Sequence, residues 1–225
     1  MITKNKQRQI VLNIIIIAGV AALAVLAFLA YKELTKPAAV VIPIASGAGS
    51  DNADVAQEAT DETPVTPAAV AEYKVADDAP RMLRINSLKI AAKVRPMGLN
   101  SIKAIAAPIN IYDSGWYSGS AKPGTPGAMF IDGHASGATR MGLFAYIDTL
   151  KVGEQVSVEK GNGEVLNYKV VHVETVSKDA VDMTKVLRTY GGAKEGLNLM
   201  TCTGTWIKDE KTYDKRAVVY TERVS

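Results

Sequence analysis

The residue best suited to covalent chemistry occurs once in this chain. Cys202 is the only cysteine among the 225 residues, and it lies in the stretch NLMTCTGTW at the end of an apolar run. A lone cysteine cannot close a disulfide within the chain, so it is either a small buried hydrophobic residue or a reactive thiolate. A thiolate that attacks a carbonyl carbon needs an acid/base partner and donors for the oxyanion that forms.

The chain offers two histidines as partners for this thiol. His172 lies in KVVHVET, where it alternates with valines, so we expect it to project from a sheet face without a chemical role. His134 follows the apolar run AMFID and a glycine, and it precedes the loop-forming stretch ASGATRMG. Catalytic side chains are common at such junctions, where a rigid scaffold holds a loop. We therefore predict that His134 is the acid/base.

Arg216 is the candidate for the oxyanion donor. Beyond Cys202 the chain runs TGTWIKDEKTYDKRAVVY, with polar turn residues in the middle and a β-branched run that begins at Arg216. This pattern predicts two antiparallel strands, with Cys202 at the end of the first and Arg216 at the start of the second. The guanidinium would then place a fork of donors near the thiol. The alternative is a surface arginine, like the neighbouring Lys215.

The elements that must position these residues are mostly strands. Gly161-Asn162-Gly163 separates two alternating runs and predicts a hairpin. Short helices are expected in MGLFAYIDTL and in DAVDMTKVL, with Asp179 as N-cap. The predicted strands are MLRI, LKIAAKV, GAMFIDGH, EQVSVEK, EVLNYKVVHVETV, LNLMTC and RAVVYTERV. Seven or eight short strands with turn-rich links predict an all-β sandwich or barrel.

The N-terminal part predicts a membrane anchor. Residues 10–31 are apolar except for Asn13, and as a helix they would span roughly 33 Å, enough to cross a bilayer. Three basic residues precede them, which predicts a cytoplasmic N-terminus (1–9) and an extracellular C-terminal part. The alternative, a cleaved signal peptide, usually has an apolar region of only about 7–15 residues.

The remaining chain divides into a spacer and one domain. Residues 32–80 are rich in Ala, Pro, Asp, Glu and Thr, so we expect a flexible extracellular spacer. Residues 81–225 have the length of a single domain. No basic run is interleaved with aromatic residues, so nucleic acid is not an expected partner.

The motifs resemble those of the sortases, the membrane-anchored cysteine transpeptidases of Gram-positive bacteria. GWYSGSAKPGTPGAMFIDGHASG (115–137) resembles the run to their catalytic histidine, NLMTCTGTW their Leu-x-Thr-Cys signature, and YDKRAVVYTE their arginine strand. The order His, Cys, Arg and the anchor with its spacer match as well. The Gly-Trp-Tyr and Pro-Gly-x-x-Gly elements look most like class D to F. Two departures are Asn198 in place of the more usual Thr, and Ala-Ser-Gly after His134.

The resemblance implies a closed β-barrel of about eight strands and assigns the catalytic roles. Cys202 would be the nucleophile, His134 the acid/base and Arg216 the oxyanion stabiliser. Thr201 would frame the oxyanion site, and Leu199 would contact substrate. The implied reaction cleaves an LPxTG-like sorting signal after its threonine, holds the acyl group as a thioester, and transfers it to an amine of a peptidoglycan precursor or a pilin.

Chemistry adds expectations about pH and cofactors. With ordinary pKa values near 8.5 and 6.5, the thiolate–imidazolium pair is about 1% of the enzyme at pH 7 if the two groups titrate independently. Slow turnover and a bell-shaped pH profile are therefore expected. No cofactor is expected, and we predict no metal, because the acidic cluster of calcium-binding relatives is not visible. Substrate choice is expected to depend on residues 175–196, where Gly191-Gly192 suggests a mobile loop.

Two other interpretations remain open on sequence grounds. An L,D-transpeptidase is also an exported Cys/His/Arg enzyme, but it would need a Ser-x-Gly-Cys-x-Arg context, whereas Cys202 lies in Met-Thr-Cys-Thr-Gly. The second is a membrane-tethered, non-catalytic β-domain in which Cys202 is a core residue. A thiol that resists alkylation in the folded state would favour this domain.

Overall fold

The computed structural model describes residues 61–100 and 102–224. The predicted membrane helix (10–31) and the first part of the predicted spacer lie outside these ranges. Among the described residues, the helices are too short or too polar to span a bilayer.

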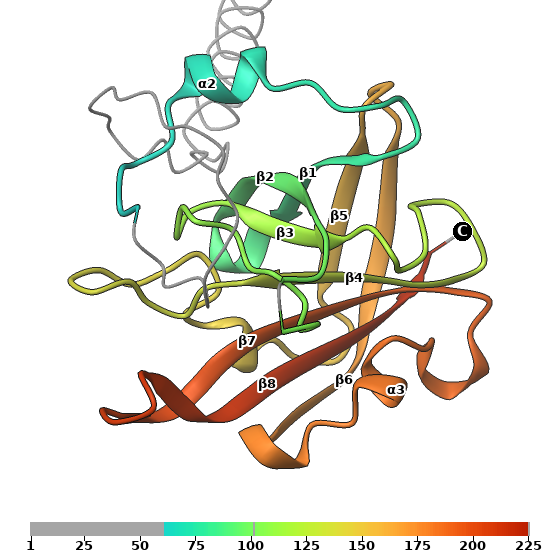
Figure 1. Cartoon of the computed structure of the whole chain (residues 1–225). Helices are drawn as coiled ribbons and strands as arrows, with labels where there is room; N and C mark the ends of the chain where they lie inside the picture. Colours follow the sequence, from blue (N-terminus) through green and yellow to red (C-terminus); the bar gives the residue numbers. More distant parts are fainter. Residues whose placement is uncertain (1–60, 101, 225) are drawn as a thin grey trace, which may run out of the picture. The chain divides into compact units, whose positions relative to one another are not determined.

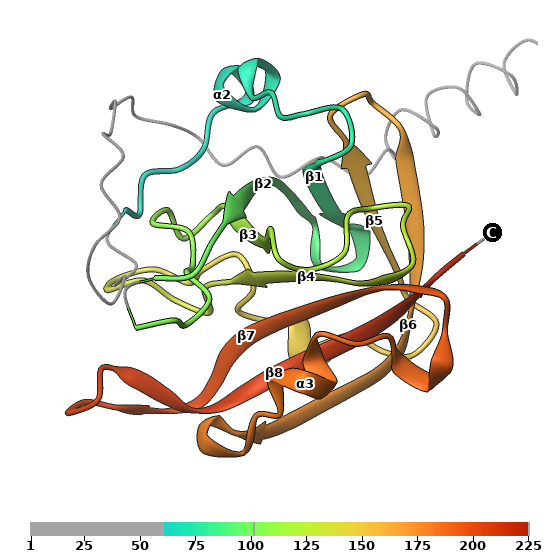
Figure 2. The same ribbon diagram turned by 45° about the vertical axis from the view of Figure 1, so that its right-hand side comes forward.

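Eight strands close into a barrel with the order β1-β2-β3-β4-β7-β8-β6-β5 (Figures 1 and 2). Two pairs, β2 with β3 and β4 with β7, are parallel, and the others are antiparallel. The strands are β1 (Pro80–Ile85), β2 (Ile90–Met97), β3 (Ser114–Tyr117), β4 (Gly127–Gly133), β5 (Gln155–Lys160), β6 (Val165–Ser177), β7 (Glu195–Ile207) and β8 (Thr212–Arg223). The predicted closed β-barrel is therefore confirmed.

Alternation along the strands divides their side chains between two faces. Leu197 and Leu199 of β7 point inward and are fully buried, together with Ile131 of β4 and Val219 of β8. A second buried cluster lies on the outer face of the same strands and includes Phe130. Strands β4, β7 and β8 therefore carry buried side chains on both faces. Side chains on their outer face are partly shielded from water, as reacting groups often are.

The outer face of β7 and β8 is covered by the connection between β6 and β7, which contains α3 (Met183–Val186) (Figures 1 and 2). The side chain of Asp182, rather than that of Asp179, caps α3 by accepting from two backbone N–H groups of its first turn. Gly191 and Gly192 both have positive φ, at 62° and 80°. They allow the tight turn that leads the chain back into β7.

All seven predicted strands and the hairpin at Gly161–Gly163 are confirmed, but one strand was missed and one predicted helix is absent. β3 was not predicted, because four residues are too few to show a period of two. MGLFAYIDTL forms only a 3-10 turn at Ile147–Thr149. Phe144 and Ile147 of this stretch are fully buried, so packing into the barrel end overrides local helix propensity.

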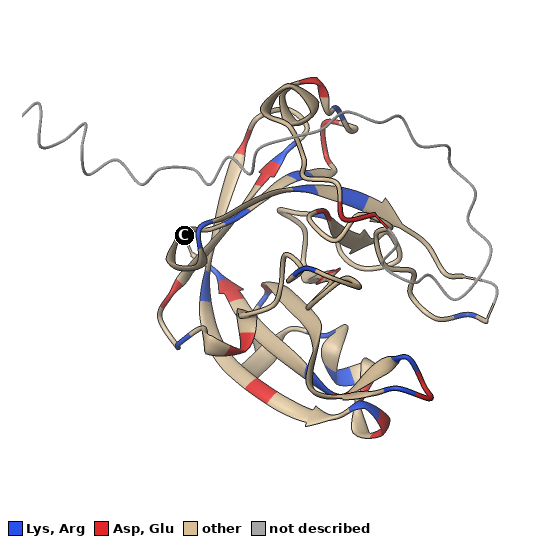
Figure 3. Cartoon of the chain, turned by 90° about the vertical axis from the view of Figure 1, so that its left-hand side faces the viewer, with Lys and Arg blue, Asp and Glu red and all other residues tan. Residues whose placement is uncertain are grey.

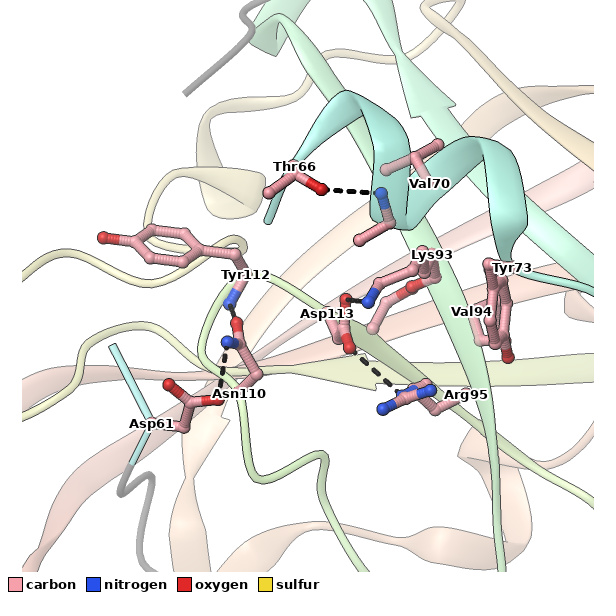
Figure 4. Close-up of polar contacts among 12 residues, drawn as sticks. Asp61, Thr66, Val70, Tyr73, Lys93, Val94, Arg95, Asn110, Tyr112 and Asp113 are labelled. Atoms are coloured by element: carbon pink, nitrogen blue, oxygen red, sulfur yellow. Dashed lines mark hydrogen bonds and ion pairs between the residues drawn. The ribbon is translucent and has the colours of Figure 1, made fainter. Parts of the chain in front are cut away.

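Part of the expected spacer is packed against the barrel. Residues 61–79 include α2 (Pro67–Glu72), which Thr66 caps through a 2.6 Å hydrogen bond from the backbone N–H of Ala69. The Tyr73 hydroxyl donates to the carbonyl of Val94 in β2 at 2.7 Å. Figure 4 shows Tyr73 beside Arg95, whose guanidinium lies 5.4 Å from the ring centroid. This aromatic side chain therefore attaches the segment to β2.

Charged residues of both signs are interspersed along the barrel (Figure 3). The buried Asp113 is paired with Lys93 at 3.4 Å and with Arg95 at 3.1 Å beneath α2 (Figure 4). Burial nevertheless raises the pKa of Asp113, and the two cations only partly offset it.

Candidate active site

Cys202 and Arg216 are directly opposite each other on the antiparallel strands β7 and β8. Directly paired residues have Cβ atoms about 5 Å apart and share a face. The predicted proximity is thus present, but the predicted loop boundaries were wrong. Both strands continue beyond this pair to a turn after Ile207, and Gly204, with φ of 93°, permits a shift in register.

His134 follows β4, which runs parallel to β7 with Asp132 opposite Met200. The Thr201 hydroxyl donates to the carbonyl of Gly133 at 2.8 Å, so the alignment persists one residue further. Continuing this register places His134 beside Cys202, on strands about 5 Å apart. Cys202 and Arg216 thus pair across β7 and β8, and the extended register of β4 leads His134 toward the same level.

The ring of His134 is oriented by a loop. Its Nε2 lies 2.6 Å from the carbonyl oxygen of Pro108, in the connection between β2 and β3. Because a carbonyl can only accept, Nε2 must carry the proton, and Nδ1 is the basic nitrogen of the neutral ring. Nδ1 is therefore the ring nitrogen that can accept a proton when the imidazole is neutral.

The guanidinium of Arg216 is held by the residues at the start of β8. Nη1 donates to the carbonyls of Tyr213 and Lys215 at 2.8 and 2.9 Å, and Nη2 donates to the Thr212 hydroxyl at 3.0 Å. The Thr212 side chain also lowers the pKa of the Cys202 thiol, so it influences both the arginine and the thiol. These three bonds use part of a five-donor fork and fix its plane.

Burial shifts the two titratable partners in opposite directions. It raises the pKa of the half-buried Cys202 thiol, although the charge of Arg216 and hydrogen bonds to Thr212 and Tyr213 partly offset the shift. It lowers the pKa of His134, against the opposing effect of the Pro108 hydrogen bond. The resting pair at neutral pH is therefore thiol and neutral imidazole.

Asp132 is a further group at the site that its sequence context did not mark as functional. Its Oδ1 is buried without a hydrogen-bond partner among the described residues, and burial raises its pKa well above the usual range. A Cβ on Gly115 of β3 would lie only 2.5 Å from this oxygen. The glycine of the Gly-Trp-Tyr element thus makes room for the carboxyl group.

Three other residues considered from the sequence lie elsewhere. Leu199 and Thr201 are 0% and 5% exposed, and alternation places them on the face opposite Cys202. Their side chains are therefore not available to substrate at the thiol, and the Thr201 hydroxyl instead aligns β7 with β4. His172 projects from β6 and stacks on Tyr190, with ring centroids 4.8 Å apart.

A profile of the sortase domain matches residues 83–224. The chain belongs to the sortase family. This confirms the resemblance drawn from the motifs around its histidine, cysteine and arginine. No curated protein sequence matches the chain.

Solved sortase structures have the same fold. Sortase A from Corynebacterium diphtheriae aligns at 21% identity and a TM-score of 0.50, covering 65% of this chain and 61% of that one. Group B Streptococcus Pilus Island 1 sortase C2 aligns at 22% identity and a TM-score of 0.50, covering 68% of this chain and 77% of that one. A sortase C-1 mutant from S. pneumoniae gives 19% and 0.51, covering 68% of each. The chain thus spans less than two thirds of the C. diphtheriae enzyme.

In this sortase, Asn198 ties the connection between β6 and β7 to the sheet. Its buried Nδ2 donates to the carbonyls of Val186 and Arg188, at the end of α3, at 2.7 and 2.8 Å. Asn198 shares the outer face of β7 with Met200 and Cys202. Asn198, which stands where the family usually has threonine, therefore attaches the β6–β7 connection to the outer face of β7.

The sortase has no cluster of three or more His, Cys, Asp or Glu able to hold a metal ion within residues 61–100 and 102–224. Pro108, Thr212 and Asp132 were all missed by sequence analysis. Pro108 and Asp132 act through contacts with residues far away in the sequence, whereas Thr212 contacts Arg216 within β8.

Proposed function

We propose that this protein is a membrane-anchored transpeptidase of the sortase family, with an extracellular catalytic domain. It cleaves an LPxTG-like sorting signal after threonine and transfers the acyl group to an amine of a peptidoglycan precursor or a pilin. Membership of the family supports the reaction type. The observation that supports the assignment is that Cys202 pairs with Arg216 across β7 and β8, while β4, which leads to His134, runs beside β7. The motifs favour class D to F.

In the proposed first half-reaction, the thiol proton passes to Nδ1 of His134 as the sulfur attacks the threonine carbonyl. The oxyanion of the tetrahedral intermediate lies against the Arg216 guanidinium. The C–N bond then breaks, and the departing amine takes the proton from the imidazolium. A thioester remains on Cys202.

In the second half-reaction an acceptor amine attacks the thioester and gives its proton to His134. The C–S bond breaks, and the thiolate recovers that proton. The two halves return the enzyme to its neutral resting pair, so no external acid or base is consumed.

Trapping of the acyl-enzyme tests this function. The protein incubated with an LPxTG peptide should gain the mass of the acyl fragment on Cys202, and adding an amine should release that mass as an amide. Cys202→Ala is the control. A protein that binds the peptide without the mass gain, and whose thiol resists alkylation, is instead a non-catalytic β-domain. The half-buried position of Cys202 on the outer face argues against a core role.

Arg216→Lys tests the oxyanion role. An ammonium cannot reproduce the planar fork, so we expect kcat to fall about 100-fold or more, the range for loss of an oxyanion donor. Lys215→Ala, an exposed change at the next residue, is the matched control. Near-wild-type turnover of Arg216→Lys, measured by peptide cleavage, would remove Arg216 from the mechanism.

A further inference from the structure

Two loops hold His134 in place. The first connects β2 to β3 and supplies the Pro108 carbonyl that accepts from Nε2 at 2.6 Å. The second follows β4 directly, and in it the carbonyl of His134 accepts from the backbone N–H of Phe144 at 2.9 Å. The loops touch where Leu143 donates to the carbonyl of Ile111 at 2.8 Å. The orientation of the imidazole thus depends on how these two loops are fixed.

The segment Asp61–Thr63 reaches the first loop. Asp61 forms a parallel bridge with Asn110, and its carbonyl accepts from the backbone N–H of Ile111 at 3.0 Å. The Asn110 side chain donates to Asp61 Oδ2 at 2.9 Å and to the carbonyl of Thr63 at 2.8 Å. Figure 4 shows Asp61 and Asn110 side by side. These bonds fix the chain two residues after Pro108.

Glu62, the residue after Asp61, reaches the second loop. Glu62 Oε1 accepts from the backbone N–H of Thr139 at 2.7 Å, and the Thr139 hydroxyl donates to Oε2. The carboxylate lies against Gly137, where an added Cβ would be 2.3 Å from Oε1. Hydrogen bonds to an ionised carboxylate are among the stronger kinds. They hold the loop only a few residues from His134.

We propose that Glu62 is a positioning residue for His134. With Asp61 it fastens the two histidine-holding loops to each other from a segment outside the barrel, and this keeps the Pro108 carbonyl on Nε2 and Nδ1 toward the thiol. The catalytic consequence rests on the proposed transpeptidase function, whereas the effect on the imidazole does not. Removal of the carboxylate loosens the second loop and lets Nε2 exchange its proton with water.

The test compares three variants of the full chain. Glu62→Ala removes both acceptors, whereas Glu62→Gln keeps one oxygen for the Thr139 N–H. Glu72→Ala, an exposed change in α2 of the same segment, is the control. The first readout is the NMR resonance of the His134 Nε2–H, which should exchange slowly with solvent because of its bond to Pro108. His172 is an internal reference. The second readout is kcat/KM for peptide cleavage.

We expect Glu62→Ala to lose the protected Nε2–H signal and about tenfold or more in kcat/KM, because small misplacements of a catalytic base are costly. Glu62→Gln should keep the signal and remain within about twofold, like the Glu72→Ala control. An unprotected signal in the wild type, or one unchanged in Glu62→Ala, overturns the proposal. So does a lost signal with an unchanged rate. If the wild type cleaves no peptide, the proposed function fails, and the signal alone still decides whether Glu62 positions the ring.

Discussion

At the scale of single residues, the site is a neutral thiol–imidazole pair beside a fixed guanidinium. Burial raises the pKa of Cys202 and lowers that of His134. Both shifts reduce the share of the thiolate–imidazolium form below the value expected from ordinary pKa values. In the proposed reaction Arg216 would then have to stabilise charge as it develops, and slow turnover remains the expectation.

The same shifts predict the pH profile. The pair is competent when it holds one proton, so the rate should rise as His134 loses its proton and fall as Cys202 loses its own. Because the lower pKa moves down and the upper one moves up, kcat/KM should have a broader maximum than a pair with ordinary values near 6.5 and 8.5. Measuring kcat/KM from pH 5 to 10 checks this, and a narrow maximum between those ordinary values would contradict the burial of the pair.

Asp132 provides a second residue-scale prediction. In its ionised form, Asp132 raises the pKa of the Cys202 thiol. Asp132→Asn should therefore lower that pKa and increase alkylation of Cys202 at mildly alkaline pH. The rate of iodoacetamide modification against pH measures the shift, with Asp209→Asn in the exposed β7–β8 turn as control. Thr212→Val should raise the pKa of the Cys202 thiol, because the Thr212 side chain lowers it in the wild type.

At the scale of elements, the connection between β6 and β7 was expected to be a mobile substrate loop. The structure attaches the α3 end of this connection to β7 through Asn198, and α3 packs on the outer cluster. The buried side-chain amide of Asn198 therefore supplies the hydrogen bonds that attach this connection to β7. The sequence showed the asparagine but not its partners, because they lie on a different element.

Asn198→Ala should loosen the attachment of the β6–β7 connection to β7. Two hydrogen bonds are lost and two carbonyls are left without this donor, so we expect a loss of about 2 kcal/mol in the free energy of unfolding. Peptide KM should rise more than kcat falls, because the catalytic residues stay on their strands. Urea denaturation and steady-state kinetics measure the two effects. Asn167→Ala, an exposed change on β6, is the control, and equal behaviour of the two variants would contradict a role for Asn198.

At the scale of the whole described domain, the catalytic unit extends upstream of the barrel. Arg81 in β1 donates to the carbonyls of Val70 and Tyr73 at 3.2 and 2.9 Å, and to Glu159 of β5 at 2.8 Å. One side chain thus joins α2 to the β1–β5 pair that closes the barrel. The segment 61–79 is part of the fold rather than a free linker.

Arg81→Ala should loosen this attachment. Loss of charge-assisted hydrogen bonds from a half-buried side chain predicts a decrease of about 2 kcal/mol in the free energy of unfolding. Amide hydrogen exchange in α2 should also be faster than in the wild type, whereas exchange in β7 should not change. The exposed Lys74→Ala is the matched control. Unchanged exchange in α2 would show that Arg81 does not hold the segment.

The sequence by itself determined the identities of Cys202, His134 and Arg216 and most of the strands. These depend on residue chemistry and on a local period of two, both of which can be read within a few residues. Only the tertiary structure decided which strands are neighbours, and so it alone supplied Pro108, Thr212 and Glu62. The contacts of Pro108 and Glu62 join segments that are far apart in the sequence, and burial in the folded domain shifts the pKa values of Cys202 and His134. The short β3 and the ordered segment before β1 were missed for the same reason: long-range packing, not local pattern, stabilises them.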